Sequence, residues 1–143
     1  MNIDITVFCL TYNHADYIRD ALESFLMQKT SYAYNVFVYD DASTDGTSDI
    51  LREYEKKYPE IFDIYISSCN IYNSPEREKI MDKLYKEHIV GRYVAWCEGD
   101  DYWIDSNKLQ KQIEFMEQNP ECSMTAHGAY WLDCQTGVLK DYN

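Results

Sequence analysis

Apolar residues along the chain follow two spacings, and the spacings alternate. Short runs rich in β-branched and aromatic residues predict strands at 3–10, 35–39, 61–66 and 92–97. Apolar residues three or four positions apart predict helices at 17–28, 47–57, 76–88 and 107–118. This alternation predicts an α/β fold, with a mostly parallel sheet and helices on both faces. After Pro120 the pattern changes to short strands at 123–132 and 137–139, with a turn between them.

Length and composition narrow the classes of partner. The chain has 143 residues and no Pro/Gly-rich linker, so we expect a single domain. Its net charge of −12 argues against a nucleic acid or an anionic membrane as a direct partner. A phosphorylated small molecule held through a divalent cation stays compatible with that charge. The five cysteines form no CxxC pair and the N-terminus lacks an export signal, so we expect reduced thiols and a cytoplasmic protein.

Polar clusters follow three of the predicted strands. They are 11–13 (Thr-Tyr-Asn), 40–46 (Asp-Asp-Ala-Ser-Thr-Asp-Gly) and 98–101 (Glu-Gly-Asp-Asp). Ligands of open α/β sheets bind at the carboxyl ends of the strands, so we expect the clusters to meet there. For the first cluster two interpretations stay open. Asn13 binds a ligand, or Asn13 or Asp16 caps the helix that follows.

The second cluster is rich in side-chain oxygen. A calcium loop of the EF-hand type starting at Asp41 is rejected, because its twelfth position is Arg52 and a strand precedes it. One or two of the hydroxyl or acidic residues at 43–45 could cap the next helix. Capping leaves Asp40 and Asp41 unexplained, because adjacent carboxylates at the end of a buried strand need hydrogen-bond donors. A nucleoside offers such donors through a base N–H and the ribose hydroxyls.

The third cluster concentrates carboxylates around one glycine. Glu98, Asp100 and Asp101 would attract a hard cation, and Mg²⁺ or Mn²⁺ needs only one or two protein carboxylates when substrate phosphates complete its shell. The alternative is a solvent-facing Asp/Gly turn. The chain has no GxGxxG, GxxxxGK or GxSxG motif, and its three histidines lack zinc-site spacing.

Together the clusters resemble a known family. "VFCLTYNHADYIRDALESFLMQ", "VFVYDDASTDGTSDIL" and "GRYVAWCEGDDYWIDSNKLQKQIEFME" look like the N-terminal half of family 2 glycosyltransferases of the GT-A fold. The resemblance implies inverting, metal-dependent transfer of a sugar from a nucleoside diphosphate, with UDP favoured, to an acceptor hydroxyl of a polysaccharide or glycoconjugate. It implies a nucleotide-sugar-binding part at 1–119 and the start of an acceptor part at 120–143.

The same resemblance assigns roles to individual residues. The nucleotide-sugar site would comprise eight residues, with the metal held by the last two: Thr11, Tyr12, Asn13, Asp40, Asp41, Glu98, Asp100 and Asp101. The cofactor would be Mn²⁺ or Mg²⁺, and the protein would work in the cytoplasm, at the inner face of a membrane if it makes surface polysaccharide.

The chain departs from the family pattern at Leu10 and Glu98, where the family more often has proline and aspartate, and in two further places. Residues 67–88 lack the usual basic motif, which leaves Arg77 as a candidate for holding the donor. No residue after Asp101 matches the motif that supplies the catalytic base, and Asp133 has no positional argument. We therefore expect the base outside this chain. Two alternatives stay open: a non-catalytic or truncated nucleotide-sugar-binding module, and, less favoured because residues 3–13 lack Gly, Lys and Arg, a nucleotidyltransferase.

Overall fold

The computed structural model describes residues 2–141. The chain forms two compact units, residues 1–111 and 112–143, and the division falls within the last helix. The first unit contains every predicted site residue, so the fold that positions the site is the fold of that unit.

The first eight elements agree with the sequence predictions to within two residues at each end. They are β1 (Ile5–Thr11), α1 (Ile18–Leu26), β2 (Tyr34–Asp40), α2 (Thr47–Lys57), β3 (Phe62–Ile66), α3 (Arg77–His88), β4 (Tyr93–Trp96) and α4 (Lys108–Gln118). The predicted α/β class is confirmed.

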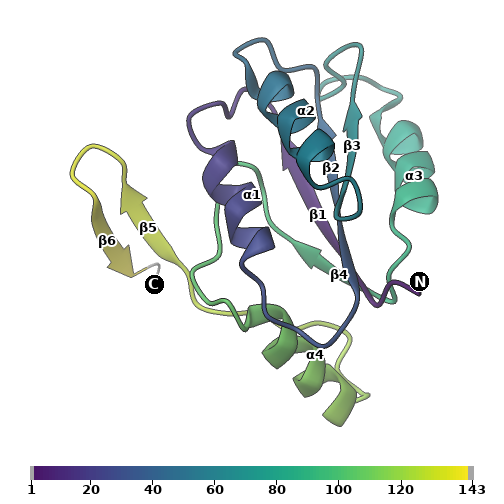
Figure 1. Cartoon of the computed structure of the whole chain (residues 1–143). Helices are drawn as coiled ribbons and strands as arrows, with labels where there is room; N and C mark the ends of the chain where they lie inside the picture. The colour runs from purple at the N-terminus through teal and green to yellow at the C-terminus, as the bar shows by residue number, and fades with distance from the viewer. Residues whose placement is uncertain (1, 142–143) are drawn as a thin grey trace. The chain divides into compact units, whose positions relative to one another are not determined.

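The four strands form one parallel sheet in the order β3-β2-β1-β4. The chain runs outward from β1 to β3 with α1 and α2 on one face, and α3 then returns across the other face to β4 (Figure 1). The winding direction therefore reverses between β1 and β4. In doubly wound sheets this reversal point, at the carboxyl ends of the strands, is where ligands bind.

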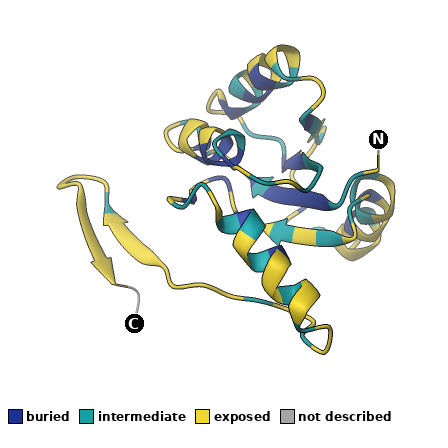
Figure 2. Cartoon of the chain, turned by 60° about the horizontal axis from the view of Figure 1, so that its bottom comes forward, coloured by how far each residue is buried: buried dark blue, intermediate teal, exposed yellow. Residues whose placement is uncertain are grey.

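Each face of the sheet buries one set of alternating side chains. Phe8, Phe37 and Tyr39 form a cluster with Met81 and Leu84 of α3. On α1, four of the five positions that the helical spacing selects are buried, and the fifth, Leu26, is partly buried: Ile18, Ala21, Leu22 and Phe25 are the buried four. Figure 2 shows β1 buried and the outward faces of the helices exposed. Burial on both faces explains why β1 and β2 are continuous apolar runs.

The second unit carries an antiparallel hairpin of β5 (Tyr130–Asp133) and β6 (Val138–Asp141). The prediction of a strand over 123–132 is wrong for residues 123–129, which have no strand conformation. The physical reason is pairing, because the four residues of β6 offer partners only from Tyr130↔Asp141 to Asp133↔Val138. Of the helices in residues 2–141, none has the length and apolar character needed to cross a bilayer.

Candidate functional site

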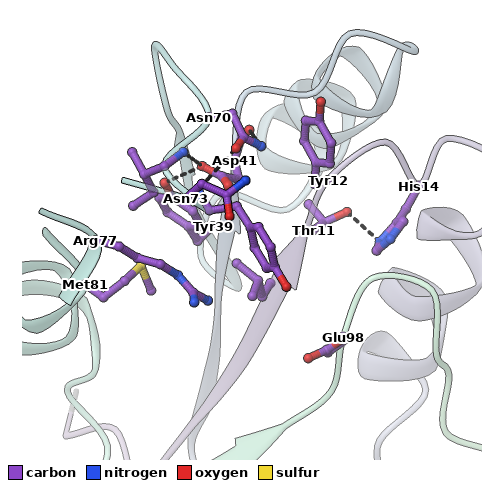
Figure 3. A pocket seen from close by; sticks show the side chains of 13 residues that line it. Thr11, Tyr12, His14, Tyr39, Asp41, Asn70, Asn73, Arg77, Met81 and Glu98 are labelled. Carbon is purple, nitrogen blue, oxygen red and sulfur yellow. Dashed lines mark hydrogen bonds between the residues drawn. The ribbon is translucent and has the colours of Figure 1, made fainter. Parts of the chain in front are cut away.

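A cavity of about 480 Å³ opens at the carboxyl ends of β1 and β2 (Figure 3). Of the eight predicted site residues, four line it: Thr11, Tyr12, Asp41 and Glu98. The other lining residues come from β1, β2, the loop after β1, the segment before α3, and α3 itself: Leu10, His14, Tyr39, Asn70, Ile71, Tyr72, Asn73, Arg77 and Met81. The three predicted strand-end clusters thus meet in the first unit, and the cavity is large enough for a small ligand.

Asp41 is held on one side and free on the other. Its Oδ1 accepts hydrogen bonds from the backbone N–H of Ile71 at 2.7 Å and from the hydroxyl of Tyr39 at 3.0 Å. Burial raises the pKa of Tyr39, and the bond to Asp41 adds to it, so the phenol stays protonated and donates. Within residues 2–141 no side chain or backbone donor bonds Oδ2. The carboxylate therefore presents one unused acceptor at the cavity.

Asp40 is saturated by its own loop. It is fully buried, and it accepts hydrogen bonds from the N–H of Ser43 at 3.0 Å, the hydroxyl of Ser43 at 2.5 Å and the hydroxyl of Ser48. The expectation that a nucleoside must supply its donors is corrected, since the loop and the start of α2 supply them. Asp40 is also not among the side chains that line the cavity.

Asn13 ties the first polar cluster to the second. Its backbone N–H donates to Ser43 Oγ at 2.8 Å, and its Oδ1 accepts from the N–H of Thr44 at 2.8 Å. The suggestion that Asn13 or Asp16 caps α1 is wrong, because that helix begins with no side-chain cap. Asn13 and Ala42 both have left-handed backbone, with φ of 55° and 63°. Non-glycine residues adopt it at a cost that the surrounding bonds must offset.

Asp45 holds the first residue of α2 from the position before Gly46, which is the N-cap, and the helix itself has no side-chain cap. Its Oδ1 accepts from the N–H of Thr47 at 3.0 Å and the Thr47 hydroxyl at 2.6 Å, and its Oδ2 accepts from the N–H of Ala15 at 2.9 Å. Burial alone would raise the pKa of Asp45, but these hydrogen bonds outweigh it and lower the pKa. Gly46 follows with φ of 102°, a conformation that favours glycine.

The acidic turn lies against β1 through its glycine. The Gly99 N–H donates to Leu10 O at 2.9 Å, and a Cβ at Gly99 would meet Thr11 Oγ1 at 2.6 Å and His14 Nδ1 at 3.0 Å. Only a residue without a side chain fits there. This close packing holds the turn at the end of β1. Glu98 lines the cavity there, whereas Asp100 and Asp101 do not line it and are exposed.

The carboxylates of this turn have almost no protein partners. The nearest side-chain partner is His14, whose Nε2 lies 3.8 Å from Asp100 Oδ2. Partial burial and the neighbouring Asp100 charge both raise the pKa of Asp101, against a smaller opposite effect of His14. No three His, Cys, Asp or Glu side chains within 2–141 gather into a metal-binding group. Two adjacent, mutually repelling carboxylates instead fit an ion that completes its shell with substrate phosphates, as Mg²⁺ and Mn²⁺ do.

Sequence reasoning missed part of the site. Residues 70–73, which sequence reasoning did not single out, line the cavity from the loop before α3. Arg77, which it did name as a candidate, follows them with its guanidinium 5.3 Å from the Tyr72 ring. Arg77 is the only arginine or lysine among the described lining residues. The loop lacks the family's usual motif, so no pattern marked it. His14 was set aside for its lack of zinc spacing, although its place directly after the first cluster was an available signal.

Comparisons with known proteins give the family of the chain. The model of the family described as glycosyl transferase family 2 matches residues 6–131. TuaG of Bacillus subtilis, named for teichuronic acid biosynthesis, is 37% identical over 137 residues, which cover 96% of this chain and 50% of TuaG. WfaP of Escherichia coli, named as a UDP-Glc:alpha-D-GlcNAc-diphosphoundecaprenol beta-1,3-glucosyltransferase, is 33% identical over 113 residues, covering 79% of this chain and 41% of WfaP.

Solved structures show the same fold. S. aureus TarS 1–349 in complex with UDP superimposes with a TM-score of 0.64 at 25% identity, over 81% of this chain and 32% of that one. The mannosyltransferase PcManGT of Pyrobaculum calidifontis, solved with GDP-Man and Mn²⁺, gives a TM-score of 0.65 at 23% identity, over 81% and 33% of the two chains. The chain spans a third to a half of the length of such curated relatives. By the family match and the shared fold, it belongs to glycosyl transferase family 2.

Proposed function

We propose that this domain binds a nucleoside-diphosphate sugar, and that the intact protein transfers the sugar with inversion to an acceptor hydroxyl. One observation carries the proposal: the polar ends of β1, β2 and β4 meet around a single cavity at the point where the sheet reverses its winding.

The nucleoside would lie between β1 and the loop before α3. Asp41 Oδ2 is an unused acceptor suited to a base N–H, and the Tyr12 ring, 44% exposed, offers a face for stacking. Thr11 lines the same wall, and Asn13 shapes it by holding the loop at 43–44. Uridine is the base that we favour, because WfaP, which is 33% identical to this chain, is named for UDP-Glc and TarS was solved with UDP, whereas the GDP-Man complex is that of PcManGT, at 23% identity.

The diphosphate would lie toward the acidic turn. Asp100 and Asp101 would hold Mn²⁺ or Mg²⁺, with Glu98 facing the cavity beside them. When bound, such an ion supplies Lewis-acid stabilisation of the charge on the leaving nucleoside diphosphate. Arg77 lines the opposite wall and would contribute a second positive charge.

In the transfer, the acceptor oxygen bonds to the anomeric carbon as the bond from that carbon to the diphosphate oxygen breaks, and a base takes the hydroxyl proton. Asp133 is a poor candidate for the base. Its carboxylate accepts hydrogen bonds from Gln135 and Thr136, which lower its pKa and occupy it in the β5–β6 turn. We place the base in a part of the protein outside this chain.

The acceptor class follows from the relatives. The names of TuaG and WfaP refer to teichuronic acid biosynthesis and to a diphosphoundecaprenol-linked sugar, which favours a sugar or glycoconjugate acceptor. An undecaprenol-linked acceptor would bring the protein to the cytoplasmic face of a membrane. The second candidate function is a nucleotide-sugar-binding module without transfer, which the placement of Asp133 favours for this chain taken alone.

Calorimetric titration tests the donor site. UDP is titrated into the chain with Mn²⁺, with a chelator, and into Asp100→Ala with Mn²⁺. We expect binding that needs the metal and is lost in the variant, with Asp49→Ala, an exposed carboxylate on α2, as the control that binds normally. No binding of UDP, GDP or dTDP would overturn the proposal, and sugar transfer by the chain alone would rule out the binding module.

A further inference from the structure

His14 joins the three loops that build the site. Its backbone N–H donates to the Thr47 hydroxyl at 2.9 Å, which fixes it to the start of α2. Its ring Nδ1 lies 3.1 Å from Thr11 Oγ1 at the end of β1. Its Nε2 lies 3.8 Å from Asp100 Oδ2 in the acidic turn, and the ring lines the cavity (Figure 3). Through one residue, by its backbone N–H and by its ring, the first loop is thus connected to the start of α2 and to the acidic turn.

The ring has one favourable hydrogen-bonding arrangement in this setting. A lone pair on Nε2 would face the Asp100 carboxylate and repel it, so Nε2 carries the hydrogen. In the neutral ring Nδ1 then accepts the hydrogen of the Thr11 hydroxyl. Thr11 is 1% exposed, so this contact is shielded from competing water. The buried threonine therefore orients the imidazole, and the imidazole points an N–H at Asp100.

Asp100 has no other anchor. Within the part of the chain that the structure describes, His14 is the only side chain that pairs with it. The backbone of the turn is fixed by Gly99, which packs directly on Thr11 and His14. Orientation of a carboxylate by an outer partner is a common way of setting metal affinity, and loss of such a partner typically costs about 10- to 100-fold.

We propose that His14 is a positioning residue, which orients the Asp100 carboxylate and so sets the affinity of the acidic turn for the divalent cation of the donor complex. This inference rests on the proposed function, because it concerns the same cation. His14 is outside the eight predicted site residues and is not one of the carboxylates proposed to bind the metal.

The two amide residues separate the two contacts of the ring. In His14→Gln the amide nitrogen reaches the place of Nε2 and still presents an N–H toward Asp100, at a similar distance. In His14→Asn the side chain reaches only the place of Nδ1, so the contact with Thr11 survives and the one with Asp100 is lost. The matched control is His88→Asn, the same substitution at another partly buried histidine, whose Nδ1 lies 2.7 Å from Asp63 Oδ2 on β3 and which has no contact with the acidic turn.

The experiment measures free Mn²⁺ by electron paramagnetic resonance as the ion is titrated into each protein with saturating UDP. We expect His14→Asn to bind Mn²⁺ about tenfold more weakly than the wild type, whereas His14→Gln keeps most of the affinity and His88→Asn all of it. UDP affinity in chelator, and the melting temperature of each variant, report any general loss of structure.

The outcomes separate the inference from the proposed function. If the wild type binds UDP with Mn²⁺ and His14→Asn matches it, or if Gln fails as badly as Asn while both variants are folded, His14 does not position Asp100. If the wild type shows no metal-dependent UDP binding, the proposed function fails, and this inference fails with it.

Discussion

Two aspartate-rich loops lie at the same edge of the sheet, after β2 and after β4. The carboxylates of the first are hydrogen-bonded by the protein, and those of the second are almost without partners. In the loop at 40–46 after β2, Asp40 and Asp45 accept hydrogen bonds from their own loop, from α2 and from Ala15, and Asp41 uses one of its two oxygens in the same way. In the turn at 98–101 after β4, the carboxylates have a single side-chain partner among the described residues. This is His14, whose Nε2 lies 3.8 Å from Asp100 Oδ2.

The difference teaches that acidic composition does not by itself mark a metal site. A carboxylate saturated by protein donors stabilises the local fold, and it has little left to offer a ligand. Two neighbouring carboxylates that lack hydrogen-bond donors repel each other, which destabilises the charged forms. A bound cation removes this repulsion. On this reading the first loop contributes one acceptor, Asp41 Oδ2, and the second turn contributes the charge.

The largest effect should follow removal of the most saturated carboxylate. Asp40→Ala leaves three donors unpaired in a buried site, so we expect the free energy of unfolding to fall by about 3 kcal/mol. Denaturant unfolding measures it. The control is Asp49→Ala, an exposed pair with Arg52 that should change stability by less than about 0.5 kcal/mol. A similar small loss for both variants would show that the loop does not depend on Asp40.

Asp41 should affect binding more than folding. In Asp41→Asn the amide oxygen can still accept from Ile71 and Tyr39, but the free acceptor becomes a donor. Losing a hydrogen bond to a charged group predicts UDP affinity about 10- to 100-fold weaker, with little change in melting temperature. Calorimetry with a thermal melt checks both. Unchanged affinity would remove Asp41 from the nucleoside site.

Gly99 should affect the acidic turn through packing. Gly99→Ala places a Cβ 2.6 Å from Thr11 Oγ1, so the turn must shift, at a cost of about 1–2 kcal/mol of stability. The shift should also weaken Mn²⁺ binding in the presence of UDP. Gly128→Ala is the matched control, because no atom lies within 4 Å of a Cβ placed there. Equal behaviour of the two variants would mean that the turn tolerates displacement.

The smallest effect concerns acid stability. Because the folded pKa of Asp45 is lowered, its contribution is present above its unfolded pKa and is lost as the pH falls through its folded pKa. Between neutral pH and about pH 3, wild-type stability should therefore fall more than that of Asp45→Asn. Urea unfolding across this range measures the difference. A steeper fall in the variant would reverse the sign that the hydrogen bonds predict.

Much of the fold was readable from the sequence, because β1, β2 and the buried face of α1 carry periodic apolar residues and their burial is local to each element. The site was only partly readable. Asp40 and Asp41 are adjacent and chemically identical, and only the positions of Ser43, Ser48 and Ile71 in space decide that one is saturated and the other half free. Residues 70–73, which form one wall of the cavity, match no sequence motif. Their role depends on where the connection from β3 to α3 crosses the edge of the sheet.

The measurement that tests the central claim most directly is a crystal of the chain grown with UDP and Mn²⁺, with an anomalous difference map recorded at the manganese edge. The account predicts a peak at Asp100 and Asp101, with the carboxylate of Asp40 still bonded to Ser43 and Ser48. A peak within the loop at 40–46, or UDP bound in the cavity with no ion at the acidic turn, would contradict it.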